Sequence, residues 1–157
     1  MKSPDIGLKS NTKTAMIDLC NARLADAIDL SLAVKQAHWN LKGPSFIGVH
    51  ELLDQVRARL DNNADTVAER VAQLDGVALG TTQKVEDATK LSPYPTDIRK
   101  MEDHVAALVE RFATLSKSVR EAIDTADEAG DAGTADIFTS FSRDLDKDMW
   151  FLKSHLE

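Results

Sequence analysis

Apolar residues recur every three or four positions along most of this chain, which is the spacing of one face of an α-helix. The first such stripe runs from about Thr12 to Asn40, and the second from Phe46 to Leu74. A third starts at Thr96 and ends at a glycine-containing break after residue 128, and a fourth extends from about Thr134 to His155. No segment alternates apolar and polar residues as a half-buried strand would. The pattern therefore predicts four long helices.

The connections between these helices are unequal in length. Gly43-Pro44 stops the first helix, whereas Gly76 and Gly80 end the second and open a long connection over residues 77–95, with a short helical turn at 85–88. One long crossover among short loops describes a four-helix bundle, and the ferritin-like topology is one of the few that places the crossover there. We expect an all-α, ferritin-like four-helix bundle over residues 13–157, preceded by a short polar tail over residues 1–12.

The composition indicates the number of domains and the cellular compartment. The chain has 157 residues, of which 43% are hydrophobic, enough for one domain with a sizeable core. A single cysteine, Cys20, excludes an internal disulfide framework and fits a reducing cytosol. The N-terminus lacks the apolar core of a signal peptide, and no run approaches ~18 apolar residues. We therefore expect a soluble, cytoplasmic protein, and its net charge of −7 means that any contact with DNA would have to be local.

Several common sites are missing from the sequence. There is no Gly-rich phosphate loop ending in Gly-Lys-Ser/Thr and no pair of cysteines for zinc. A di-iron site inside one ferritin-like bundle needs a Glu-x-x-His on each of two helices. The position three residues before His104 is Met101, so the chain offers no such intrachain centre.

Candidate chemistry is concentrated on the second predicted helix. His50 and Asp54 are four residues apart, as are Asp65 and Glu69, so each pair projects from one face of the helix beside its apolar stripe. His38 falls on the apolar stripe of the first helix. Imidazoles and carboxylates together are ligands that suit iron, among other divalent metals.

The two pairs cannot share a metal within one chain. Asp54 and Asp65 are eleven residues apart, which is about 16 Å along a helix axis at ~1.5 Å per residue. If this helix packs antiparallel against its own copy, with a two-fold axis near Leu60, His50 and Asp54 of one chain face Asp65 and Glu69 of the other. The spacing thus predicts two identical sites per dimer, provided that the pairs bind a common metal.

A plainer alternative stays open from the residues alone. Acidic residues at this spacing are commonly a solvated helix face, and Arg57, Arg59 and Arg70 are near enough in sequence to pair with them. We assign the two remaining histidines, His104 and His155, to the polar surface.

Beyond these spacings, the chain contains a recognisable signature. It resembles the Dps family, dodecameric mini-ferritins named for DNA protection in starved cells. The matching segments are KQAHWNLKGPSFIGVHELLD at 35–54, DTVAER at 65–70, GVALGTT at 76–82, YPTD at 94–97, TADIF at 134–138 and SRDLDK at 142–147. The likeness extends from about Asn21 to Glu157.

The resemblance implies a ferroxidase centre shared between two chains. By that likeness His38, His50 and Asp54 come from one chain, Asp65 and Glu69 come from its neighbour, and two irons bind per inter-subunit site. The implied reaction is oxidation of Fe(II) by hydrogen peroxide or dioxygen, with storage of the ferric mineral inside a hollow homo-dodecamer. Trp39 looks like the family's tryptophan near the centre, where it either donates an electron or anchors the dimer contact.

Two further expectations concern iron uptake and DNA. An acid-rich stretch around the third loop would line a three-fold channel in a ferritin-like shell, and we favour Asp131 and Asp136 for that role. DNA-binding family members often carry a longer lysine-rich tail, whereas this chain has only Lys2, Lys9 and Lys13 near its start. The alternative function is therefore a nucleoid protein that packs DNA through these lysines.

Overall fold

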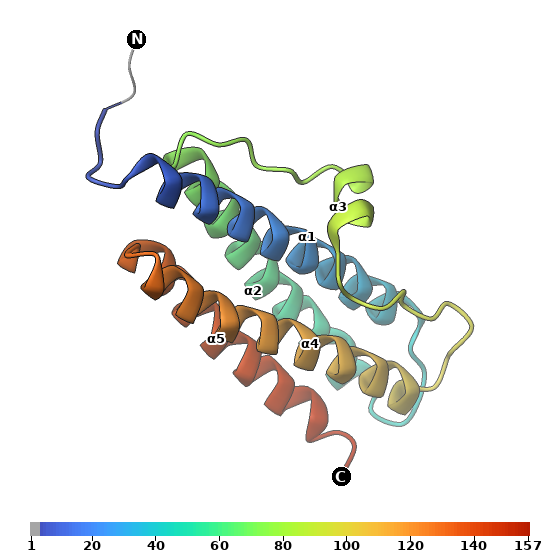
Figure 1. The fold of residues 1–157 in the computed structure, drawn as a ribbon. Coiled ribbons are helices and arrows are strands. Elements are labelled where there is room, and N and C mark those ends of the chain that lie inside the picture. The colour runs from blue at the N-terminus through green and yellow to red at the C-terminus, as the bar shows by residue number, and fades with distance from the viewer. Residues whose placement is uncertain (1–3) are drawn as a thin grey trace.

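Four long helices and one short helix account for the architecture of the computed structural model, which describes residues 4–157 (Figure 1). They are α1 Ser10–Asn40, α2 Phe46–Gln73, α3 Thr82–Ala88, α4 Met101–Glu128 and α5 Ala132–Lys153. The long helices form the bundle, and the crossover between α2 and α4 carries α3 across the outside of α1 (Figure 1). The expected all-α bundle with one crossover is therefore confirmed.

The core is the continuous apolar stripe of each long helix. On α2 every fully buried large side chain falls on the predicted stripe, from Val49 and Leu53 to Leu60. Phe112 of α4 and Phe138 and Phe141 of α5 fill the opposite half of the bundle. Burial of these side chains is the main force that fixes the four helices.

Four helix starts differ from the sequence prediction. Helix α3 begins at Thr82 rather than residue 85, and α5 begins at Ala132 rather than about Thr134. Helix α1 begins at Ser10, inside the segment expected to be a tail. Helix α4 begins at Met101 rather than Thr96. The apolar period continues through Ile98, but the carbonyl of Ile98 accepts from Nε2 of His104 and the carbonyl of Arg99 accepts from the amide of Lys42, which holds residues 98–100 out of helical form.

The turn between α1 and α2 is tied to the start of α4. The amide of Lys42 donates to the carbonyl of Arg99 at 2.9 Å, and the amide of Met101 donates to the carbonyl of Lys42 at 2.8 Å. The chain ends of three helices therefore meet at one end of the bundle, where Figure 1 shows the α1–α2 turn beside the crossover.

None of the helices described over residues 4–157 combines the length and the apolar composition needed to cross a bilayer.

Candidate metal centre

His38 at the end of α1 and His50 near the start of α2 hold each other in place. The Nδ1 atom of His38 lies 2.7 Å from the carbonyl oxygen of His50, and the Nδ1 atom of His50 lies 2.8 Å from the carbonyl oxygen of His38. A carbonyl only accepts, so both Nδ1 atoms carry the proton and both Nε2 atoms keep a free lone pair. The rings stack with centroids 3.7 Å apart. This is the tautomer that a histidine needs to bind a metal through Nε2.

Asp54 lies one helical turn beyond His50 and faces the same region. Its Oδ1 is 3.6 Å from Nε2 of His38 and 2.8 Å from Nζ of Lys35, which belongs to α1. The hydrogen bond from Lys35 lowers the pKa of Asp54. The carboxylate is therefore ionised at neutral pH, and an ammonium group occupies the place beside it.

Lys35 is a feature of this site that sequence reasoning missed. It lies three residues before His38, so the helical spacing alone would have placed it on the same side of α1. Its ammonium also lies 5.9 Å from the centroid of the Trp39 ring. Trp39 itself is 67% exposed, a large apolar side chain left open beside the histidine pair.

Asp65 and Glu69 do not join this group within one chain. Both are exposed on α2, and eleven residues of helix separate Asp65 from Asp54, about 16 Å at ~1.5 Å per residue. Across residues 4–157 no three histidine, cysteine or acidic side chains converge as a metal site. His38 contacts both the ring of His50 and, through Nε2, the carboxylate of Asp54. The second acidic pair lies elsewhere on α2.

The arginines of α2 do not pair with these acids. Arg57 binds Asp61 on its own helix, whereas Arg59 reaches Asp148 and Arg70 reaches Asp131, both on the α5 side of the bundle. The expected pairing of these arginines with the candidate acids is therefore wrong, whereas Asp54, Asp65 and Glu69 are exposed, as on a solvated helix face. Two of the three arginines instead fasten α2 to α5.

The histidine assignments to the surface are half right. His155 is exposed at the end of the chain, but His104 is buried in α4, with 1% of its surface exposed. The hydroxyl of Tyr94 lies 2.7 Å from its Nδ1, and the carbonyl of Ile98 lies 3.2 Å from its Nε2. Both ring nitrogens of His104 are therefore hydrogen-bonded to residues of the crossover that precedes α4.

The two acids favoured for an iron channel differ sharply in environment. Asp131 is 2% exposed and caps α5: its carboxylate accepts from the amide and hydroxyl of Thr134 and from Arg70. Asp136 is exposed, one turn into the same helix. The carboxylate of Asp131 is committed to structure within the chain, whereas that of Asp136 is open to solvent.

The lysines proposed for DNA do not form a free basic arm in the described residues. Lys2 lies outside them. Lys9 is exposed immediately before α1, and Lys13 is within α1, where its ammonium pairs with Asp75 at 3.0 Å. Leu8 packs against a small cluster of buried side chains at this end of the bundle.

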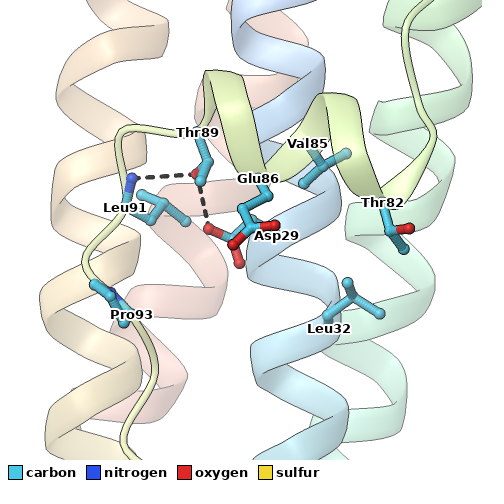
Figure 2. A pocket seen from close by; sticks show the side chains of 8 residues that line it. All are labelled: Asp29, Leu32, Thr82, Val85, Glu86, Thr89, Leu91 and Pro93. Carbon is cyan, nitrogen blue, oxygen red and sulfur yellow. Dashed lines mark hydrogen bonds between the residues drawn. The ribbon is translucent and has the colours of Figure 1, made fainter.

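A separate cavity of about 370 Å³ lies under α3, and Figure 2 shows its lining. Thr89 donates to Asp29 of α1 at 2.7 Å and accepts from the amide of Leu91 at 3.2 Å (Figure 2). Val85 is the buried apolar contact of α3. These contacts hold the crossover on α1, and the cavity shares no residue with the histidine pair.

Comparison with known proteins agrees with this architecture. The family model of the ferritin-like domain matches residues 17–157. The chain is 59% identical over 150 residues to the DNA protection during starvation protein of Agrobacterium fabrum, covering 96% of this chain and 93% of that protein. The protein of the same name from Mycolicibacterium smegmatis is 31% identical over 151 residues, covering 96% and 82%.

Solved structures of Dps proteins have the same fold as this chain. The structure described as Mycobacterium smegmatis Dps superposes with a TM-score of 0.95 at 32% identity, covering 100% of this chain and 90% of that one. DpsC from Streptomyces coelicolor superposes with a TM-score of 0.94 at 30% identity, covering 99% and 91%. The bundle, its crossover and these similarities together show that the chain belongs to the Dps family of ferritin-like proteins.

Proposed function

We propose that this protein is a ferroxidase and iron-storage protein that oxidises Fe(II) between two of its subunits. Iron is the substrate, hydrogen peroxide or dioxygen is the oxidant, and the ferric mineral accumulates inside a hollow homo-dodecamer in the cytoplasm. Removing Fe(II) and peroxide together would protect DNA from oxidative damage. The observation that carries the proposal is the reciprocal bonding of His38 and His50, which leaves both Nε2 lone pairs free, that of His38 at 3.6 Å from the carboxylate of Asp54.

The second half of the site follows from the register of α2. Asp54 and Asp65 differ by close to three full helical turns, so both lie on nearly the same face of the helix. A two-fold axis near Leu60 with antiparallel copies of α2 brings Asp54 opposite Asp65 and His50 opposite Glu69. Each dimer then has two equivalent sites, and neither chain completes one by itself.

The ligand set suits this chemistry. Neutral imidazoles accommodate Fe(II), and carboxylates favour the harder Fe(III) product. Two Fe(II) ions held together supply one electron each to a molecule of hydrogen peroxide, whose O–O bond breaks to give two hydroxide ions. A lone Fe(II) supplies only one electron and releases a hydroxyl radical. The pairing of two irons is thus what makes the reaction protective.

Lys35 adds a condition to metal binding. Its ammonium lies 2.8 Å from Oδ1 of Asp54, so a metal that binds this carboxylate competes with a resident positive charge. Such competition weakens binding, which suits a site that passes its oxidised product on to a mineral. Trp39, exposed beside the pair, is free for either of its two expected roles, electron donation or dimer contact.

The test is an anaerobic Fe(II) titration followed by a pulse of hydrogen peroxide. We expect ferric absorbance in the wild type and a loss of at least tenfold in the initial rate in an Asp65→Ala/Glu69→Ala variant. A Glu102→Ala/Glu110→Ala variant, which removes two exposed acids from α4, serves as the matched control and keeps the wild-type rate. Equal rates in the wild type and in the α2 variant would refute the proposed site.

A further inference from the structure

Half-buried Tyr94 and buried His104 and Arg111 form a cluster that the proposed iron chemistry does not use. The hydroxyl of Tyr94 lies 2.7 Å from Nδ1 of His104, and Nε2 of His104 lies 3.2 Å from the carbonyl oxygen of Ile98. The two rings lie nearly parallel, with an interplanar angle of 21° and centroids 5.9 Å apart. The cluster joins the last part of the crossover to the first turns of α4.

The proton positions in this cluster are determined by its acceptors. The carbonyl of Ile98 can only accept, so Nε2 of His104 carries the hydrogen and Nδ1 accepts from the hydroxyl of Tyr94. The bond from Tyr94 requires the neutral ring, because a protonated Nδ1 cannot accept. Burial lowers the pKa of His104 and raises that of Tyr94, so both side chains are uncharged at neutral pH.

Arg111 holds the same segment from its other end. Its guanidinium lies 5.1 Å from the centroid of the Tyr94 ring. It donates to the carbonyls of Ser92 at 3.0 Å and of Pro93, and it is anchored on its own helix by the carbonyl of Ala107 at 2.8 Å. The crossover from residue 92 to residue 98 is therefore hydrogen-bonded to two side chains of α4, His104 and Arg111, which lie about two helical turns apart.

The next residues of this segment bind the turn that carries the two histidines. Arg99 follows Ile98 directly, and its carbonyl accepts from the amide of Lys42 at 2.9 Å. The amide of Met101 returns a bond to the carbonyl of Lys42 at 2.8 Å. Lys42 lies in the α1–α2 turn, between His38 and His50. A continuous set of hydrogen bonds thus connects the ring of His104 to that turn.

We propose that Tyr94 and His104 are positioning residues for the metal site: by fixing residues 98–101 they fix the α1–α2 turn, and with it the directions of the two Nε2 atoms of His38 and His50. This inference rests on the proposed function, because it deepens that same site. Each histidine ring is hydrogen-bonded to the backbone carbonyl of the other histidine. A shift of the turn between them therefore changes the directions of both Nε2 atoms together.

The experiment uses the full-length assembled protein and Co(II), which is not oxidised in the site and reports its coordination in its visible spectrum. Three variants break or restore the cluster. Tyr94→Phe removes one hydroxyl, and His104→Leu removes both ring contacts. His104→Gln keeps one acceptor and one donor. Val119→Ala, a buried position far along α4, is the control for a general loss of stability.

We expect Tyr94→Phe and His104→Leu to weaken Co(II) binding about three- to tenfold, less than the 10–100-fold typical of direct partners of a metal ligand. The Co(II) spectrum changes with them, and backbone hydrogen exchange at Lys42 and Met101 becomes about tenfold faster, since these amides lose their fixed acceptors. His104→Gln recovers most of both effects, and Val119→Ala alters neither.

Unchanged Co(II) binding and spectrum in Tyr94→Phe and His104→Leu would overturn the inference, even if exchange at Lys42 increased. If His104→Leu does not fold, Tyr94→Phe decides alone, because it removes a single oxygen atom. A different outcome tests the proposed function. If the wild type binds no Co(II) that depends on Asp65 and Glu69, the shared metal site is wrong, while exchange at Lys42 still shows whether the cluster fixes the turn.

Discussion

His38 and His50 donate their Nδ1 protons to each other's backbone carbonyls, at 2.7 and 2.8 Å. The side chain of each residue is therefore oriented by the main chain of the other, and the stacked rings leave little room for either to rotate alone. Outer partners of this kind set the tautomer and direction of a metal-binding histidine. Here the two candidate ligands provide that support for one another, across the turn from α1 to α2.

This relationship predicts strong coupling between the two histidines. Replacing either residue by alanine removes one ligand and the ring on which the other imidazole stacks, although the remaining ring keeps its hydrogen bond to the main chain. We expect His38→Ala and His50→Ala each to weaken Zn(II) binding at least tenfold, and the double variant to cost less than the sum, with a coupling of about 0.5–3 kcal/mol. Calorimetric titration of the four proteins measures it. Strict additivity would contradict mutual support.

The ion pair between Asp131 and Arg70, which joins α5 to α2, should be sensitive to acid. Burial pushes the pKa of its carboxyl up, but the hydrogen bonds from Thr134 and Arg70 outweigh burial and leave the pKa below its usual value. The folded state then binds a proton less tightly than the unfolded state. The stabilisation is complete above the unfolded value, about 3.9, and is lost as the pH falls below it.

We therefore expect Asp131→Asn to lower the melting temperature at pH 7 and to show a shallower loss of stability below about pH 4 than the wild type. Removing one partner of a buried ion pair costs about 3–5 kcal/mol. Asp136→Asn, an exposed position on the same helix, should stay within about 0.5 kcal/mol of the wild type. Thermal melts between pH 3 and 7 measure both, and parallel curves for wild type and Asp131→Asn would argue against this role.

Asp136 leads to a prediction about iron uptake rather than stability. If its exposed carboxylate lines a three-fold channel, twelve-subunit shells with Asp136→Asn should take up Fe(II) about two- to tenfold more slowly at low ionic strength, because a ring of negative charge no longer concentrates the cation. The difference should shrink as salt is raised. Stopped-flow mineralisation checks this, and Glu110→Gln on α4 is the matched exposed control. An unchanged rate would remove Asp136 from the pathway.

The lysines near the N-terminus predict weak DNA binding at most. Lys13 is paired with Asp75, and each chain carries a net charge of −7. We expect a gel shift, if one is seen at low salt, to disappear at about 0.15 M salt and after deletion of residues 1–9, which removes Lys2 and Lys9. Retention at that salt in the deleted protein would instead support the alternative of a DNA-packing protein that does not depend on this segment.

The sequence pattern and the structure agree for features that depend only on the helical period of apolar residues. The stripes of α2 and α5 and the existence of the crossover follow from spacing and helix breakers, because burial of an apolar face needs no further information. The candidate ligands on α2 are also readable, since their spacing fixes a common face. The start of α4 could not be predicted, because hydrogen bonds between Lys42 and the segment Arg99–Met101, which are far apart in sequence, override a continuing apolar period.

Polar partners were the least predictable feature. His104 was expected on the polar surface, yet it is buried, and its ring nitrogens are hydrogen-bonded to Tyr94 and Ile98 of the crossover. Arg59 and Arg70 lie near candidate acids in sequence but bind residues of α5. Such choices depend on which helices become neighbours, which a helical period alone does not specify.

The central claim is that each metal site is completed by two chains, and subunit mixing tests it directly. One protein carries His38→Ala/His50→Ala and the other carries Asp65→Ala/Glu69→Ala; each alone should lack ferroxidase activity. Dissociated and reassembled in equal amounts, half of the dimers are mixed, and each mixed dimer has one intact site of two, so about one quarter of the wild-type activity should return. If the mixture stays inactive while assembling normally, the sites are not shared between chains and the account is wrong.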